Sequence, residues 1–145
     1  MTTDGIAFEL SGTPMGKERV RLTKGGHAYT PERTVNFEAR LAYAAQQSMG
    51  QRPLFDGPLL VVVEAFLPIA KSKPKRFHAA ALTGQIRPTK KPDWDNVGKM
   101  LDALNLIVWT DDAQIVDGRV IKWYSARPRL VVTVRQINTE EGVFS

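Results

Sequence analysis

The chain has 145 residues, of which 43% are hydrophobic and 24% charged, so it can form one compact domain and is not disordered in composition. Lys and Arg number 20 against 15 Asp and Glu, and the resulting net charge of +5 favours a polyanionic partner. Cysteine is absent, which excludes disulfides, thiolate zinc sites and cysteine nucleophiles and is consistent with a reducing compartment. We expect a single domain over residues 1–145 and a cytoplasmic protein.

No segment predicts a membrane span or a secretory signal. Residues Met1–Leu10 contain Asp4 and Glu9 and have no cationic start followed by an apolar run. The most apolar stretch, Leu59–Ala70, is twelve residues long and is interrupted by a glutamate and a proline, so it is too short to cross a bilayer. We therefore expect a soluble protein with no membrane partner.

The first part of the chain predicts a strand, a hairpin and a long helix. Weak alternation of apolar residues over Ile6–Leu10 indicates a short strand. Residues 17–29 contain two short extended pieces around a Lys-Gly-Gly sequence, which is typical of a hairpin tip. Thr30 as N-cap and Pro31 as the first helical residue predict a helix start, and helical spacing of apolar residues continues to Gly50.

The second part predicts a central strand, two helices and two final strands. Leu59–Leu67 is β-branched and apolar on both faces, as in a buried strand. The alanine-rich centre of residues 71–91 predicts a short helix, and a second helix is expected over about Asp93–Leu106. Ile115–Tyr124 and Leu130–Ile137 predict strands that we expect to pair with each other antiparallel. This order of elements predicts an α+β (mixed α/β) domain with a mixed or antiparallel sheet.

Charge is separated into a basic block and an acidic block. Residues 71–91 contain seven Lys or Arg and no acid, whereas residues 93–117 contain six Asp and one Lys. In the helix expected from Asp93, the apolar stripe consists of Val97, Met100, Leu101 and Leu104. Asp95, Lys99 and Asp102 share the opposite face at spacings of four and three residues. The pair Asp111-Asp112 follows at the entry to a strand.

Clustered carboxylates of this kind suit Mg²⁺, which prefers hard oxygen ligands and activates water for attack on a phosphodiester. Basic residues nearby would hold a nucleic-acid backbone, and Lys99 could stabilise the charge that develops in the transition state. Each element also has a simpler interpretation: Asp93 and Asp95 as helix caps, Asp95–Lys99 as an i,i+4 ion pair, and Asp111-Asp112 as turn residues. The three tryptophans, Trp94, Trp109 and Trp123, are interpreted as core or edge packing residues, and the two histidines as surface or loop residues.

Three strings together resemble the RusA family of Holliday junction resolvases. They are Pro-Asp-Trp-Asp-Asn-Val-Gly-Lys at 92–99, Asp-Ala-Leu-Asn at 102–105 and Val-Trp-Thr-Asp-Asp-Ala-Gln-Ile at 108–115. The Gly-x-Pro-x-x-Lys sequence at 12–17 is similar too. The resemblance implies a RusA-like fold and a small, homodimeric, Mg²⁺-dependent endonuclease, with Mn²⁺ as a candidate substitute. Such an enzyme nicks opposing strands of a four-way DNA junction.

By motif position, the resemblance implies that Asp93, Asp95 and Asp112 are the metal-binding catalytic carboxylates and that Lys99 is the catalytic lysine. Successive side chains of extended backbone point to opposite faces, so only one of Asp111 and Asp112 is expected to reach the metal, and we favour Asp112. The role of Asp102 stays open. From charge and proximity to the motif, the residues predicted to line the DNA backbone are Lys17, Arg19, Arg21, Lys71, Lys73, Lys75, Arg76, Lys90 and Lys91.

Two other functions stay open at this point. The protein could be a nuclease of flaps or other branched DNA intermediates, because junction choice depends on dimer geometry that one chain does not reveal. It could also be a non-catalytic, structure-specific DNA-binding protein, although all the motif residues are intact. A ribonuclease or phosphotransferase is disfavoured because the sequence has no Gly-rich P-loop and no strand-linked Gly-x-Gly-x-x-Gly.

Overall fold

The computed structural model describes residues 4–137. Its elements in chain order are β1 (Gly5–Ser11), β2 (Arg21–Leu22), β3 (Ala28–Tyr29), α1 (Glu32–Met49), β4 (Leu59–Leu67), α2 (Lys75–Leu82), α3 (Trp94–Lys99), the 3₁₀ turns η1 (Met100–Leu104) and η2 (Asp112–Gln114), β5 (Ile115–Tyr124) and β6 (Arg129–Gln136). The predicted mixture of helices and strands is confirmed. Among the described residues, no helix has the length and apolarity needed to cross a membrane.

Four strands form one mixed sheet in the order β1-β6-β4-β5. β6 is antiparallel to both β1 and β4, whereas β4 and β5 are parallel. The predicted pairing of the last two strands is wrong, because β4 lies between them. The turn after β5 crosses the end of β4, where the Ser125 N–H donates to the Leu67 carbonyl at 2.9 Å. The chain can therefore insert the most apolar strand into the middle of the sheet, where both of its edges are paired.

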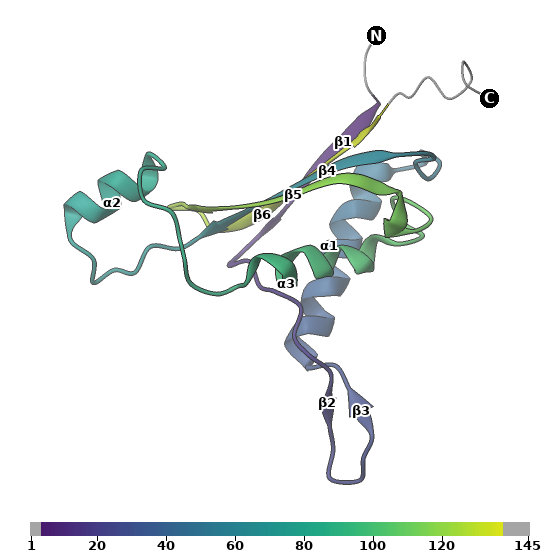
Figure 1. Cartoon of the computed structure of the whole chain (residues 1–145), viewed down its shortest axis with the longest axis horizontal. Helices are drawn as coiled ribbons and strands as arrows, with labels where there is room; N and C mark the ends of the chain where they lie inside the picture. The colour runs from purple at the N-terminus through teal and green to yellow at the C-terminus, as the bar shows by residue number, and fades with distance from the viewer. Residues whose placement is uncertain (1–3, 138–145) are drawn as a thin grey trace.

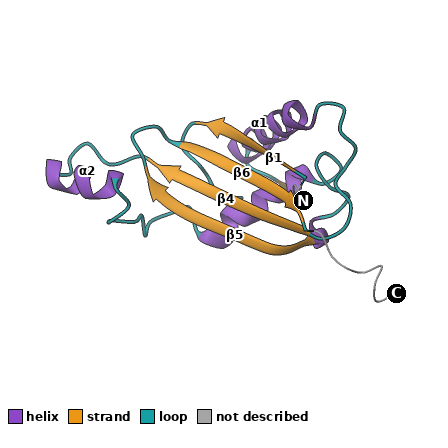
Figure 2. Cartoon of the chain, turned by 90° about the horizontal axis from the view of Figure 1, so that it is seen from above, coloured by secondary structure: helices purple, strands orange, loops and turns teal. Residues whose placement is uncertain are grey.

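Helices cover one face of this sheet. α1 and α3 lie on the same side, as Figures 1 and 2 show from two directions. Alternate residues of β4 are accordingly buried, and Val63 is paired with Val120 on one side and Val132 on the other. The prediction of a central strand is confirmed, but the side chains on its other face stay partly exposed. The core thus lies between one sheet face and the helices.

The hairpin and the first helix agree with the sequence except at the helix cap. β2 and β3 form the predicted hairpin, which projects away from the sheet (Figure 1). Pro31 is the cap instead of Thr30, because its ψ of 141° is extended and the helix begins at Glu32. The helix ends at Met49, and Gly50 follows with a φ of 56°, a left-handed conformation that favours glycine.

The acidic helix that was expected over about Asp93–Leu106 is shorter in the structure. The α-helical part ends at Lys99, and the chain continues as a 3₁₀ turn only to Leu104, after which Asn105 is extended with a ψ of 133°. The predicted apolar stripe is confirmed, since Val97, Met100, Leu101 and Leu104 are all buried. The predicted helix of the basic block is α2, which lies beyond the end of the sheet and apart from the helical layer (Figures 1 and 2).

Candidate active site

The segment that follows β1 packs along α3. The Lys17 N–H donates to the Asn96 carbonyl at 2.8 Å. A Cβ on Gly16 would lie 2.7 Å from the Asn96 Cβ and 3.3 Å from the Pro92 Cβ, so only glycine permits this close approach. Residues far apart in the sequence thereby meet beside the acidic helix.

Lys17 lies between two acidic side chains from different helical elements. Its Nζ is 3.5 Å from Asp102 Oδ2 in η1 and 3.9 Å from Glu38 Oε2 in α1. The Lys17 side chain is 30% exposed, compared with 59% for Lys99. Lys17 is therefore the more firmly placed of the two lysines, and part of its charge already has partners in the protein.

Asp102, Asp111 and Asp112 form an acidic cluster. A hydrogen bond with Asp102, a second with Asp111 and partial burial raise the pKa of Asp112 to about 6, and the charges of both neighbours act in the same direction. Near neutral pH the cluster thus holds closely spaced negative charges that repel one another. Among residues 4–137, however, no three acidic or histidine side chains are already arranged as a set that could hold a metal ion.

Gln114 holds the Asp111-Asp112 turn in place. Its Oε1 accepts hydrogen bonds from the Thr110 and Asp111 N–H groups, at 3.0 and 3.2 Å. Its Nε2 donates to the carbonyls of Phe55 and Gly57, at 3.0 and 3.1 Å. The glutamine of the motif thus ties the turn to the loop before β4.

The residues around this turn are also anchored in the core. The Trp109 side chain is completely buried, and its Nε1 donates to Asn105 Oδ1 at 2.7 Å. The packing role expected for Trp109 is confirmed, whereas the same expectation for Trp94 is wrong, because that residue lies on the outer face of α3 and is 63% exposed. Reasoning about chemistry alone passed over the structural roles of Asn105 and Gln114, although both stand in the strings that carried the resemblance.

Asp95 and Lys99 lie on the exposed face of α3, as predicted. Lys99 Nζ is 3.7 Å from Asp95 Oδ2, and both side chains are more than half exposed. An exposed ion pair of this kind contributes little to the stability of the fold. The ion-pair interpretation therefore fits the contact, but stabilisation is a weak reason for these two residues. Together with Asp102 and Lys17, this face presents alternating charges toward solvent.

Asp93 occupies the cap position of α3 but does not cap it with its side chain. Its backbone is extended, with φ −69° and ψ 146°, and its carboxylate makes no hydrogen bond to the helix start. The carboxylate lines a cleft instead. The interpretation of Asp93 as a side-chain cap is therefore wrong, because no N–H group of the first helical turn donates to its carboxylate.

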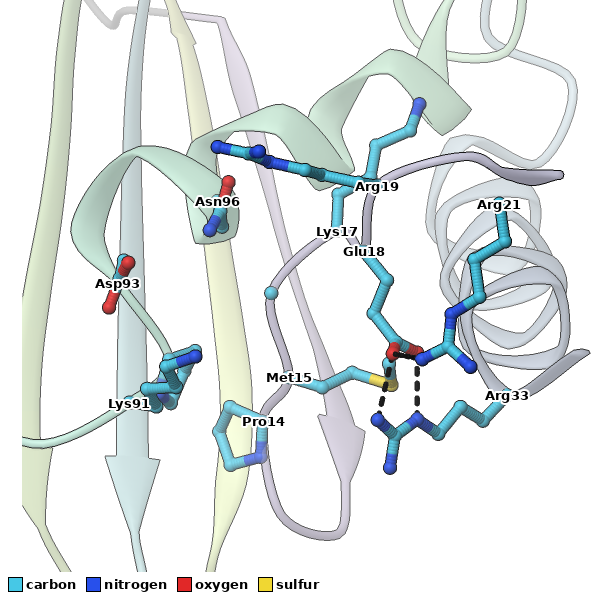
Figure 3. A pocket seen from close by; sticks show the side chains of 12 residues that line it. Pro14, Met15, Lys17, Glu18, Arg19, Arg21, Arg33, Lys91, Asp93 and Asn96 are labelled. Atoms are coloured by element: carbon cyan, nitrogen blue, oxygen red, sulfur yellow. Dashed lines mark hydrogen bonds and ion pairs between the residues drawn. The ribbon is translucent and has the colours of Figure 1, made fainter. Parts of the chain in front are cut away.

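The cleft runs between the segment after β1 and the start of α3 and has a volume of about 660 Å³ (Figure 3). Its lining residues are Pro14, Met15, Gly16, Lys17, Glu18, Arg19, Arg21, Arg33, Lys91, Pro92, Asp93 and Asn96. Five of these twelve are Lys or Arg, so the cleft is mainly basic. Four of the residues that were predicted to line the DNA backbone also line this cleft, namely Lys17, Arg19, Arg21 and Lys91.

Glu18 fixes one wall of the cleft. It accepts two hydrogen bonds of 2.7 Å from Arg33 and one of 3.0 Å from the buried Thr34 hydroxyl. The Arg33 hydrogen bond, reinforced by Thr34 and by the charge of Arg21, lowers the pKa of Glu18 to about 2. Figure 3 shows Arg21 and Arg33 around this carboxylate. Arg19 and Lys91, by contrast, have no ion-pair partner among the described residues, so their charge is available to a ligand.

The rest of the basic block is attached to the far end of β5 by stacking. Arg87 lies 3.6 Å from the centre of the Trp123 ring, and Lys90 lies 5.8 Å from that of Tyr124. The residues of this block that were predicted to contact DNA are Lys71, Lys73, Lys75, Arg76 and Lys90. The block and the acidic cluster lie at opposite ends of β5, a ten-residue strand of about 30 Å.

The structure thus distributes the predicted site residues over three adjoining places. Asp112 lies in the acidic cluster with Asp102 and Asp111, Asp95 pairs with Lys99, and Asp93 lines the cleft. Within residues 4–137 no ion pair or hydrogen bond joins Asp93 or Asp95 to Asp112. Their common role stays a prediction.

A basic cleft beside closely spaced carboxylates and lysines, on one layer of helices over a mixed sheet, is an arrangement suited to a DNA nuclease. A family model described as "Endodeoxyribonuclease RusA" matches residues 11–135, and the chain belongs to the RusA endodeoxyribonuclease family. The chain is also 35% identical over 141 residues to the uncharacterized protein YqaN of Bacillus subtilis (strain 168). This match covers 93% of the chain and 99% of that protein.

Proposed function

We propose that the protein is a divalent-metal-dependent endonuclease that resolves four-way DNA junctions by paired nicking. The observation that carries the proposal is the acidic cluster, in which Asp112 has its pKa raised to about 6 by two neighbouring carboxylates. Carboxylates that are held close together, so that the pKa of one of them is raised, are typical of a functional site. The adjoining basic cleft supports a nucleic-acid substrate.

The donor set fits a hard cation. Asp93, Asp95 and Asp112 would hold Mg²⁺, or Mn²⁺ in its place, and all three offer the carboxylate oxygens that these ions prefer. The repulsion that raises the pKa of Asp112 is what a divalent cation would relieve. When bound, the ion would polarise the phosphodiester and lower the pKa of the attacking water.

The lysines have separate tasks in this proposal. Lys99, exposed beside Asp95, is free to approach the negative charge that develops on the phosphate. Lys17 holds Asp102 through its 3.5 Å contact and thereby positions the cluster around Asp112. Water attacks phosphorus, the bond to the 3′ oxygen breaks, and that oxygen takes up a proton, leaving a 3′ hydroxyl and a 5′ phosphate.

The substrate would be held along the basic surface. Arg19, Arg21 and Lys91 would contact the backbone at the cleft, and the block around α2 would contact it further along the duplex. The distance spanned by β5, about 30 Å, is close to one turn of duplex DNA, about 34 Å. Two such sites in a homodimer would suit the two-fold symmetry of a four-way junction.

The test compares a synthetic four-way junction with a flap substrate and with linear duplex of the same sequences, in Mg²⁺ and in EDTA. Wild-type protein is measured beside Asp95→Asn and beside Glu32→Gln, a control that neutralises an exposed acid on α1. We expect paired, symmetric nicks in the junction alone, lost in EDTA and in Asp95→Asn but kept in Glu32→Gln. Equal cutting of flaps would instead indicate a general branched-DNA nuclease. Tight junction binding without any nick would leave a structure-specific DNA-binding protein and refute the enzyme.

A further inference from the structure

The outer edge of the sheet at β5 is long and largely uncovered. β5 has ten residues, and no other described strand pairs with its outer side (Figure 2). Residues 116–119 are all exposed, and the Val116 side chain is 64% exposed. An edge of this length is a ready template for pairing with another strand, and proteins normally block or use it.

Within residues 4–137, contacts block only the second half of this edge. The Arg87 Nε donates to the Lys122 carbonyl at 2.7 Å, while the guanidinium stacks on Trp123. This hydrogen bond shows that the Lys122 carbonyl is directed away from β4. Because backbone groups alternate in direction along a strand, Val120 and Gly118 also direct their N–H and C=O groups outward. The backbone donors and acceptors of the first half are therefore open.

The sequence of the open half is self-complementary about Gly118. It reads Ile-Val-Asp-Gly-Arg-Val-Ile over residues 115–121. If two copies pair antiparallel about a two-fold axis at Gly118, Asp117 of each copy lies opposite Arg119 of the other, and Val116 lies opposite Val120. Opposite charges and β-branched residues in these positions stabilise a strand pair. Within one chain, Arg119 Nε lies 3.8 Å from Asp117 Oδ1, and both side chains are about half exposed or more. Exchanging this partner for the same residue of a second chain keeps each charge paired, so both can reach across to that chain.

Gly118 suits the position on the axis. Its N–H would donate to the Gly118 carbonyl of the second copy, and its own carbonyl would accept from the Gly118 N–H of that copy, as in a hydrogen-bonded antiparallel pair. Glycine inside a strand often marks a place where another backbone approaches closely. The charges here also distinguish the partner: one Asp and one Arg are neutral together, whereas a DNA-contacting surface would be basic.

We infer that the protein forms a two-fold dimer by antiparallel pairing of β5 with β5 of a second copy, centred on Gly118. This inference names the interface of the homodimer proposed above. It joins two four-stranded sheets into one of eight strands and places both α3 helices on the same face. Asp112 lies six residues before Gly118, so the two acidic clusters are at most about 40 Å apart along the paired strands. Both sites would then face one junction.

Charge reversal tests the register. Arg119→Asp places Asp against Asp, and Asp117→Arg places Arg against Arg, so each variant should raise the dimer Kd about tenfold or more. A mixture of the two variants restores both opposite-charge pairs, and so does the double variant Asp117→Arg/Arg119→Asp. We expect recovery of the dimer in both cases, measured by sedimentation at matched concentrations. Circular dichroism checks that each variant is folded.

A disulfide trap provides an independent measurement. The chain has no cysteine, so Gly118→Cys introduces a single thiol. Paired Cα atoms about 5.5 Å apart are within disulfide range. The matched control is Ala7→Cys, an exposed residue on β1, the opposite edge of the sheet. We expect a covalent dimer on oxidation for position 118 and none for position 7.

The outcomes separate the interface from the rest of the function. A wild-type dimer that both reversals leave unchanged, without a covalent dimer at position 118, would overturn the β5 interface while leaving the homodimer intact. A wild-type monomer that nonetheless makes nicks would overturn both the interface and the homodimer but not the nuclease. Loss of nicking in Asp95→Asn with an unchanged dimer would leave the interface standing, because β5 pairing does not depend on catalysis.

Discussion

Replacing Asp112 with Asn should stabilise the metal-free protein at neutral pH while removing cleavage. The Asp112 carboxyl has its pKa raised from 3.8 to about 6 by Asp102, Asp111 and partial burial. Between these two values the folded state binds more protons than the unfolded state. The free energy of unfolding therefore falls as the pH rises through about 4 to 6 and stays lower above it. An amide at this position carries no charge and removes that cost.

The size of the effect follows from the shift. Two units of pKa correspond to about 3 kcal/mol before screening. Because Asp112 is only half-buried and stays in contact with water, screening reduces the expected gain to about 1 kcal/mol. For a chain of this length, 1 kcal/mol raises the Tm by about 3 °C.

The assay is thermal unfolding of wild-type protein and Asp112→Asn in EDTA at pH 4 and at pH 8. We expect the difference in Tm at pH 8 and only a small difference at pH 4, because pH 4 lies close to the unfolded pKa of 3.8 and well below the folded pKa of about 6, so that little of the cost of ionising Asp112 has been incurred. Glu32→Gln serves as the control for loss of an exposed acid. The reasoning is refuted if Asp112→Asn has no advantage at pH 8. An equal advantage at both pH values would refute it too, because the gain would then come from packing rather than from charge.

Four further predictions concern the metal, the supports of the site and the DNA surface. Mg²⁺ should raise the Tm of wild-type protein but not of the acid-to-amide variants, and EDTA should reverse it; an equal rise in both would place the ion elsewhere. Lys17→Met should lower kcat about tenfold or more with little change in junction Kd, and Lys17→Arg should recover part of it; a change in Kd alone would make Lys17 only a phosphate contact. Gln114→Ala removes four hydrogen bonds and should reduce the free energy of unfolding by about 2 kcal/mol in urea titrations, whereas no loss would show that the turn holds itself. Replacing Lys73, Lys75 and Arg76 with Ala should weaken junction binding and reduce its salt slope by up to about 3, and unchanged binding would remove α2 from the DNA surface.

The elements that depend on neighbouring residues could be predicted from the sequence. The helix over 32–49, the hairpin around Gly25 and the buried stripe of α3 all follow from local spacing and turn residues. Errors at their ends, such as the cap at Pro31, arise because a one-residue shift changes little in the pattern. The motif strings likewise identified the family, because their residue types and spacings are readable without coordinates.

The order of the strands and the composition of the acidic cluster were decided by the tertiary structure. β5 and β6 are joined by a short turn, so local reasoning favours their pairing; burial of β4 between them is a non-local gain that no spacing reveals. Lys17 and Asp102 are 85 residues apart, and their contact depends on how closely Gly16 lets two segments approach. The sequence by itself determined which charged groups are available for the predicted chemistry, because residue type sets charge and ordinary pKa. Only packing decided which of them lie together, because distances between charges follow from the fold and not from their order along the chain.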